Sequence, residues 1–336
     1  INGLKKILPL FSDNVLKLDK NEKIYRNSAK KILVAKKNIK LGHLISRDDI
    51  RSVRQDDIKI DNYINWNDLV GKTAAGPIPL GLKFTRNDVE QNLYALIIVR
   101  SQSTRFSGKC YSMIGENESI RILIKRIKKS RKVKKIILCT TNNKADDRLE
   151  EIAKEEDIQF VRGSANVENR ISLAFKIHQI PDFFVRLTGD NIFIDTQHLD
   201  NALEKVINED SEYYKHDSVI DGCDFEIIKH DAYLTLPYYY DNFEENSEYM
   251  TLFLNNNYFR KSSAFVYKDF QNYKNYRLTF DYDGDYVNLK TLYEFTQDIY
   301  MSYKQIYTTL EENNLYKRFL HEDKSTNITP TKRVTF

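Results

Sequence analysis

The sequence predicts an α/β protein with a doubly wound sheet, preceded by a small β-rich domain. The run Ala95–Val99 is apolar without alternation, which is typical of a strand covered on both faces. From this run to Asp190, strand-like and helix-like segments alternate, as in a parallel sheet wound with helices. Before it, residues 29–89 show short strands and frequent turns. With 336 residues, the chain has room for two domains with cores of their own.

Composition excludes several classes of protein. Charged residues make up 30% and hydrophobic residues 41%, and no run approaches the ~18 apolar residues of a membrane span. The net charge of +4 is too small to indicate a nucleic-acid partner. Cys110, Cys139 and Cys223 lack metal-type spacing, which favours a reducing cytoplasm without disulfides or bound zinc. The chain starts at Ile1 without methionine or signal peptide, so we expect a fragment or a processed form.

The first part of the chain contains a repeated turn. After a helical lead-in over 1–26, residues 27–92 contain Gly42 followed by Ser46-Arg-Asp-Asp49, and Gly81 followed by Thr85-Arg-Asn-Asp88. In both copies a turn glycine precedes a Ser or Thr that stands before acidic residues in the manner of a helix N-cap. We therefore expect a small β-rich domain built from two similar halves.

Basic and hydroxyl side chains follow the first buried strand. Arg100, Arg105 and Lys109 stand among Ser101, Ser103, Ser107 and Gly108, so cations, hydroxyls and backbone N–H groups gather where the strand ends. These groups hold phosphates, and ligands of open α/β sheets bind at this edge. The loop is neither a Walker A sequence nor GxGxxG. The alternative is an ordinary basic surface loop.

The segments after this loop alternate regularly. Because the carboxyl ends of parallel strands meet at one edge, we expect their polar ends to converge there. The expected helices cover 120–130, 146–156 and 167–178, and the expected strands cover 135–141, 158–161 and 183–187.

We select Asp190 as the candidate catalytic carboxylate. It follows Gly189 at the end of the strand 183–187, where the side chain is held rigidly at the ligand edge. A ligand with several phosphates binds together with a divalent cation, and Mg²⁺ is held by one or two carboxylates plus phosphate oxygens. The alternative is that Asp190 caps a helix.

The loop and strand ends resemble those of the SpsF-like nucleotide-sugar cytidylyltransferases. Arg100, Ser103, Thr104, Arg105, Gly108 and Lys109 fall in register with that family's signature loop, and Gln102 stands where the family usually has glycine. The segment Arg186–Asn191 is similar to the strand end that supplies the metal-binding aspartate. The resemblance implies a nucleotide-diphospho-sugar transferase-like sheet with Arg105, Lys109 and Asp190 as catalytic residues. It implies these nucleotide-binding residues: Arg100, Ser103, Thr104, Thr140, Thr141, Arg162, Gly163, Ser164 and Arg186.

Elements of the later sequence also match this family. Asp221–Glu226 resembles its Gly-x-Asp-x-Glu element, which implies that Asp224 and Glu226 contact the substrate. Tyr249 replaces a histidine of the family's Glu-His-Val-Thr element. Arg277–Asp281 resembles its Arg-Leu-Thr-x-Asp strand, so Asp281 becomes the second metal ligand beside Asp190, with Asp285 as a helix cap. The Asp283-Gly284 pair leaves an acid-rich surface turn as the alternative.

The β-rich segment resembles the SAF, or antifreeze-like, domain at the carboxyl end of sialic acid synthases. The residues that match in order are Leu33-Val34-Ala35, Asp49-Ile50, Leu69–Lys72 and Asn87-Asp88-Val89. In those synthases a barrel that makes a nine-carbon acid precedes this domain, so a synthase-type barrel is an expected partner upstream. The alternative is a packing domain without a ligand.

Together the two resemblances cover nearly the whole chain, with the transferase part over 94–324 and a loose tail over 325–336. They imply a cytoplasmic, homo-oligomeric enzyme that joins CTP and an acidic nine-carbon sugar of sialic, pseudaminic or legionaminic type. Its products would be a CMP-sugar for surface polysaccharide and pyrophosphate, with Mg²⁺ as cofactor and without nucleic-acid or membrane partners. Two alternatives stay open: a nucleotide-sugar-dependent glycosyltransferase, and a non-catalytic scaffold for a sialic acid synthase.

Overall fold

The computed structural model describes residues 31–54, 64–103, 105–215, 220–256, 258–262 and 276–319. The predicted lead-in over 1–26 and the tail over 325–336 lie outside these residues. The chain divides into two compact units, one of residues 1–90 with 208–210 and the other of residues 91–207 with 211–336, and each is described by itself. Within the described residues, no helix is both long and apolar enough to cross a membrane.

The first unit is a small β-rich body. Strands β1 (Lys31–Ala35) and β2 (Ile50–Arg54) pair antiparallel, and the short helix α3 (Trp66–Leu69) follows. Isolated bridges join Ile39 to Ile78 and Ala74 to Val89, so the chain folds back on itself through turns. Its core contains Leu33, Ala35, Ile39, Ile45, Ile50, Ile64, Leu69, Ala74, Ile78, Phe84 and Val89.

The repeated turn of this unit is present in both copies. Gly42 and Gly81 have φ of 79° and 82°, a left-handed conformation that glycine adopts without steric cost. A short 3₁₀ helix follows each, over Arg47–Asp49 and Arg86–Asp88. The carboxylate of Asp49 accepts the backbone N–H and the hydroxyl of Ser46 at 2.8 and 2.9 Å. Ser46 therefore occupies the N-cap position that the sequence predicts, and the Asp49 carboxylate completes a capping box with it.

The second unit contains a mixed sheet with strand order β7-β6-β3-β8-β11-β9 in its described part. The strands β3 (Leu93–Ile98), β6 (Lys135–Thr141), β7 (Gln159–Gly163) and β8 (Phe183–Thr188) run parallel. β11 (Glu226–Lys229) pairs antiparallel with both β8 and β9 (Tyr213–Lys215). The chain runs from β3 outward to β6 and β7 and then returns to β8 on the other side of β3. This reversal is the topological switch point at which α/β sheets bind ligands.

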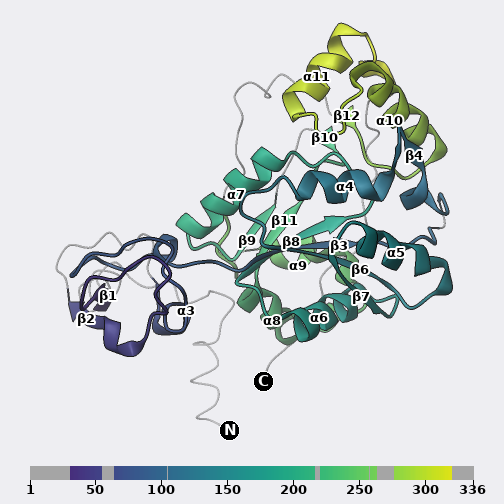
Figure 1. Ribbon diagram of the computed structural model, residues 1–336. Helices are drawn as coiled ribbons and strands as arrows, with labels where there is room; N and C mark the ends of the chain where they lie inside the picture. The colour runs from purple at the N-terminus through teal and green to yellow at the C-terminus, as the bar shows by residue number, and fades with distance from the viewer. Residues whose placement is uncertain are drawn as a thin grey trace, which may run out of the picture. The chain divides into compact units, whose positions relative to one another are not determined.

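Helices cover both faces of this sheet (Figure 1). One face packs α4 (Ser119–Ile127), α5 (Asp147–Glu155) and α7 (Thr196–Asn208), and the other packs α6 (Val167–His178), α8 (His230–Tyr239) and α9 (Met250–Leu254). Successive residues of β3 enter these two cores in alternation, and Leu96 and Ile97 are both 0% exposed. Burial on both faces explains why the run Ala95–Val99 is uniformly apolar. The predicted α/β fold is confirmed, and its strands and helices start and end within a few residues of the predicted ones.

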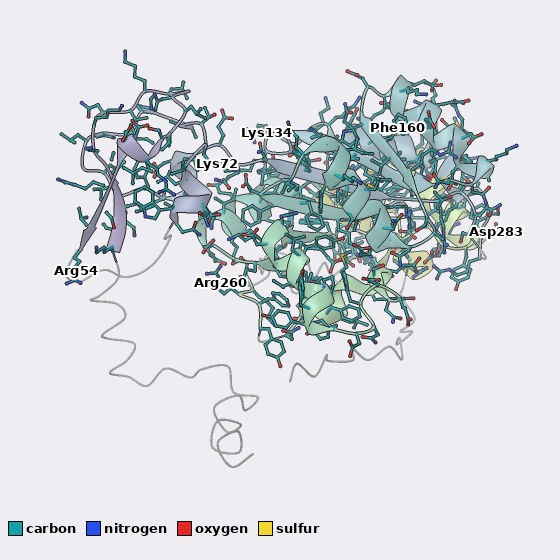
Figure 2. The ribbon with its side chains drawn as sticks, turned by 90° about the horizontal axis from the view of Figure 1, so that it is seen from below. Arg54, Lys72, Lys134, Phe160, Arg260 and Asp283 are labelled. Carbon is teal, nitrogen blue, oxygen red and sulfur yellow. The ribbon has the colours of Figure 1, made fainter. Side chains whose placement is uncertain are left out.

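The last part of the second unit lies beside the edge of the sheet where the parallel strands end. β10 (Ile220–Asp221) and β12 (Tyr276–Arg277) form a short parallel pair, and α10 (Asp283–Thr296) and α11 (Tyr303–Glu312) follow. Figure 2 shows Asp283, where α10 begins, at the margin of this unit. The predicted strand around Arg277–Asp281 is thus only two residues long, and Asp281 stands in the turn just before α10.

Candidate active site

The loop after β3 is held in place by its own backbone and by the neighbouring elements. The N–H of Gly108 donates to the carbonyl of Ser101 at 2.8 Å, and Gly108 has a φ of 74°, which favours glycine. The Ser101 N–H and hydroxyl donate to the Asp146 carboxylate at 2.7 and 2.6 Å. Phe106 packs on Phe280 with ring centroids 5.3 Å apart, which fixes the loop against the segment before α10.

Two carboxylates meet one ammonium group beside this loop. Lys109 Nζ lies 2.8 Å from Asp190 Oδ2 and 2.9 Å from Asp281 Oδ1. Arg105 Nη2 lies 2.8 Å from the same oxygen of Asp281, and Arg277 Nη2 lies 3.0 Å from its other oxygen, Oδ2. Burial opposes ionisation of Asp281, but Lys109, Arg105 and Arg277 outweigh it and hold the pKa of this carboxyl below its usual value. Asp281 is therefore ionised at neutral pH.

Backbone contacts bring Asp190 and Asp281 together. A Cβ on Gly189 would lie 2.6 Å from the side chain of Val99, so only glycine allows this close approach of β8 to the end of β3. The N–H of Phe280 donates to the carbonyl of Asp190 at 3.1 Å. The Asp285 carboxylate accepts the N–H groups of Asp281 and Tyr282 at 2.8 and 2.9 Å, as expected for a helix cap.

Two cavities adjoin this cluster of charges, and Arg100 and Ser103 line both. The larger, of about 580 Å³, opens between the ends of β3, β6 and β7. The smaller, of about 270 Å³, lies over the ends of β3 and β8. The larger is lined by Arg100, Gln102, Ser103, Ser107, Thr141, Asn142, Asn143, Asp146, Gly163, Ser164 and Ala165. The polar lining of the smaller comprises Arg100, Ser103, Arg105, Lys109, Arg170, Arg186, Thr188, Asp190, Glu248 and Tyr249.

Most residues selected from the sequence therefore face one of these cavities. Thr141, Gly163 and Ser164 line the larger one, whereas Arg105, Lys109, Arg186 and Asp190 line the smaller. Asp281 does not line either cavity, but it contacts Lys109 and Arg105, which do. Thr104 lies outside the described residues.

Four selected residues are placed away from both cavities. Thr140 is 0% exposed and faces the core on the α5 side. Arg162 turns toward α5, where it contacts Asp147 at 2.7 Å and Glu150 at 3.2 Å. Glu226 is buried and pairs with Arg186 at 2.5 Å, so it touches the smaller cavity only through that arginine. Asp224 lines neither cavity, and its carbonyl accepts a hydrogen bond from the side chain of Asn191 at 3.3 Å.

Sequence reasoning assigned no role in the site to three residues that shape it. Arg170 is buried below the smaller cavity and donates to the carbonyls of Cys139 and Val99 at 3.1 and 3.4 Å, which ties the ends of β6 and β3 together. Asp146 lies at the base of the larger cavity, and Arg277 supports Asp281. A signal was available for two of them. Arg170 stands on the helix after Arg162–Ser164, which resembles an Arg-Gly-Ser segment of the family, and Arg277 begins the segment that resembles the family's Arg-Leu-Thr-x-Asp strand.

Gln102, which replaces a glycine, forms part of the larger cavity. Its Oε1 accepts a hydrogen bond from Asn143 Nδ2 at 3.0 Å, so the two amides join the β3 loop to the end of β6 across the cavity. Tyr249, which replaces a histidine, lines the smaller cavity.

The two carboxylates fit a divalent metal ion. One oxygen of each lies within 3 Å of the same nitrogen, so both reach a single cation-sized position. No group of three or more His, Cys, Asp or Glu side chains arranged for a metal occurs among the described residues. Two hard oxygen ligands completed by phosphate oxygens are the set that Mg²⁺ prefers in nucleotide sites.

This fold and site define a nucleotide-binding transferase of the doubly wound α/β class. The cytidylyltransferase family model matches residues 94–324, which is more than half of the chain, and the SAF domain model matches residues 30–89. The chain therefore belongs to the cytidylyltransferase family and carries an additional SAF domain. The predicted class of enzyme, a CTP-dependent nucleotidyltransferase, is confirmed at the level of the family.

Three known proteins are similar to this chain. An uncharacterized protein of Methanocaldococcus jannaschii is 30% identical over 141 residues, which cover 42% of this chain and 58% of that protein. The spore coat polysaccharide biosynthesis protein SpsF of Bacillus subtilis is 28% identical over 209 residues, which cover 59% of this chain and 85% of that protein. A cytidylyltransferase structure from Leptospira borgpetersenii serovar Hardjo-bovis superposes with a TM-score of 0.61 at 26% identity, covering 70% of this chain and 100% of its own.

Proposed function

We propose that this protein transfers CMP from CTP to the anomeric hydroxyl of an acidic nine-carbon sugar and releases pyrophosphate. The observation that carries the proposal is the position of Lys109, whose ammonium group joins Asp190 to Asp281 next to the smaller cavity. Cations and paired carboxylates at a sheet edge are the groups that phosphoryl transfer requires.

In this proposal each cavity holds a different part of the substrates. The base and ribose of CTP occupy the larger cavity, whose volume lies within the usual range for small-molecule sites. The triphosphate then extends past Arg100 and Ser103, which line both cavities, toward Arg105 and Lys109. Thr141, Gly163 and Ser164 contact the nucleoside.

Asp190 and Asp281 hold Mg²⁺ in this arrangement. The bound ion would supply a positive charge that offsets the negative charge developing on the phosphates. Arg105 and Lys109 hold the β- and γ-phosphates and stabilise the departing pyrophosphate. Arg277 contacts Oδ2 of Asp281, whereas Lys109 contacts Oδ1, so Arg277 keeps that carboxylate in position.

The charge of the smaller cavity supports an acidic acceptor. Its lining contains five basic residues and only two acids, Asp190 and Glu248. Even after Lys109 and Arg105 engage the phosphates, Arg186 and Arg100 remain near the position of the acceptor. Arg186 is oriented by Glu226, so Glu226 acts on the acceptor through that arginine. The spore coat function of the Bacillus relative supports a role in surface polysaccharide synthesis.

The test is incubation with CTP, Mg²⁺ and a panel of acidic sugars, including sialic, pseudaminic and legionaminic acids and an eight-carbon acid. We expect pyrophosphate and a CMP-sugar with a nine-carbon acid. Sugar transfer from a nucleotide-sugar donor, without pyrophosphate from CTP, would favour a glycosyltransferase instead. The SAF domain supports the further proposal that a sialic acid synthase binds this protein, which co-purification of the two would test.

A further inference from the structure

The Lys109 side chain fills the position between the two carboxylates that the proposed function assigns to a metal ion. Its Nζ lies 2.8 Å from Asp190 Oδ2 and 2.9 Å from Asp281 Oδ1, and its side chain is only 12% exposed. A divalent ion bound to the same two oxygens would stand about 2 Å from each of them. The ammonium group and the metal ion therefore compete for these oxygens, both by space and by repulsion of like charges.

The surroundings allow the ammonium group to leave while the carboxylates stay. The backbone of Lys109 is anchored, because its carbonyl accepts the Ser119 hydroxyl at 2.8 Å and the N–H of Ser112 at 3.1 Å. Asp281 is held independently by Arg277 at 3.0 Å. The flexible Lys109 side chain has to turn, and so does the half-exposed side chain of Arg105, whose Nη2 lies 2.8 Å from the same Oδ1 of Asp281. Both side chains already line the smaller cavity.

We propose that Lys109 is an exchangeable counter-ion: without nucleotide it neutralises Asp190 and Asp281 and excludes the metal ion, and with nucleotide it moves to the phosphates. The proposal rests on the proposed function, because it requires a nucleotide triphosphate in the smaller cavity and a metal ion on these two acids. Its consequence is that CTP and the metal ion bind cooperatively, each raising the affinity for the other by the same factor. An ordinary phosphate-binding lysine would not have this effect on the metal.

The test is the affinity for Mn²⁺, measured by electron paramagnetic resonance with and without CTP and corrected for Mn²⁺ bound to free CTP. In the Lys109→Met variant, we expect Mn²⁺ alone to bind at least ~10-fold more tightly than in the wild type, because a charge beside the metal is removed. We also expect the factor by which CTP strengthens Mn²⁺ binding to fall by ~10-fold or more. The Lys109→Gln variant, which retains hydrogen-bond donors for both acids, should change in the same direction.

The matched control is Lys154→Met, which removes the same charge from α5, where the Lys154 side chain is 61% exposed and pairs with Glu150. This variant should bind Mn²⁺ as the wild type does, and circular dichroism shows whether each variant is folded. If both Lys109 variants are folded and bind Mn²⁺ alone no more tightly than the wild type, the counter-ion role is wrong and the proposed function stands. If the wild type binds no Mn²⁺ even with CTP, the metal site of the proposed function and this inference both fail.

Discussion

The backbone N–H of Phe280 donates a hydrogen bond to the carbonyl oxygen of Asp190, with 3.1 Å between the two atoms. This contact joins the end of β8 to the turn before α10, which are far apart in the sequence. It places Asp281, the residue after Phe280, where Lys109 reaches both acids. The pair of carboxylates is therefore built on the backbone, and substitution of either side chain should leave the local fold intact.

Asp190→Asn should lower turnover by at least ~100-fold, the loss typical of removing one group that stabilises the transition state. The substitution keeps the size of the side chain but removes the charge that holds Mg²⁺. CTP binding in the presence of Mg²⁺ should weaken as well. Metal-free CTP binding should change little or improve, because a negative charge near the phosphates is lost. Steady-state kinetics and calorimetry measure these effects.

Asp283→Asn is the matched control for this variant, since Asp283 is exposed at the start of α10 and contacts none of the charges around Lys109. It should leave both measurements unchanged. A folded Asp190→Asn protein with unaltered Mg²⁺ dependence would place the metal elsewhere. An unfolded one would show that Asp190 has a structural role.

CTP with Mg²⁺ should raise the melting temperature more than ATP or GTP does. A pocket shaped for a pyrimidine binds a purine less well, and a ligand at ~100 times its dissociation constant stabilises the folded state by about 2.7 kcal/mol. Thermal shift measurements at equal nucleotide concentrations give the comparison. Equal shifts for the three nucleotides would count heavily against cytidylyl transfer.

Gln102→Gly should tighten CTP binding and raise turnover. Gln102 reaches across the larger cavity to Asn143, so its removal opens this cavity and frees the loop to approach the triphosphate. Asn143→Ala, which breaks the same hydrogen bond but keeps the Gln102 side chain, separates crowding from the loss of the bond. Calorimetry with CTP measures both variants. Lower activity of Gln102→Gly would indicate that the glutamine contacts the substrate.

Asp146 should make stability depend on pH below about 4. Burial opposes its ionisation, but hydrogen bonds from Ser101 and Thr141 outweigh this effect and hold its pKa below the usual value. Because the pKa is lower in the folded protein than in the unfolded chain, the stabilisation is present above the unfolded pKa of ~3.9 and is lost as the pH falls toward the folded pKa. The wild type should therefore have a higher free energy of unfolding than Asp146→Asn at pH 6, and this difference should shrink as the pH falls to 3.

Urea denaturation at several pH values measures this difference. Asp147→Asn is the control, since Asp147 is next in the sequence and its side chain is 59% exposed. A difference between Asp146→Asn and the wild type that stays constant from pH 6 to pH 3 would show that the Asp146 charge does not contribute.

The sequence by itself determined the α/β fold and the edge of the sheet that carries the site. The apolar run Ala95–Val99 could only be buried on both faces, and polar residues at the ends of parallel strands necessarily share one edge. These two facts, together with the family resemblance, predict that the site contains Arg100, Arg105, Lys109 and Asp190.

Only the tertiary structure decided which of these side chains meet. Arg162 and Gly163 are neighbours, but side chains of a strand alternate between faces, so Arg162 turns to the acids of α5 while Gly163 lines the larger cavity. Which helix covers which face is set by packing across the whole sheet. The resemblance predicted Asp281 beside Asp190, but the contact that brings them together, the hydrogen bond between Phe280 and Asp190, and the position of Lys109 between the two acids came from the tertiary structure. Contacts between such distant segments leave no periodic pattern in the sequence, because they depend on how the β12–α10 turn packs against the ends of the parallel strands.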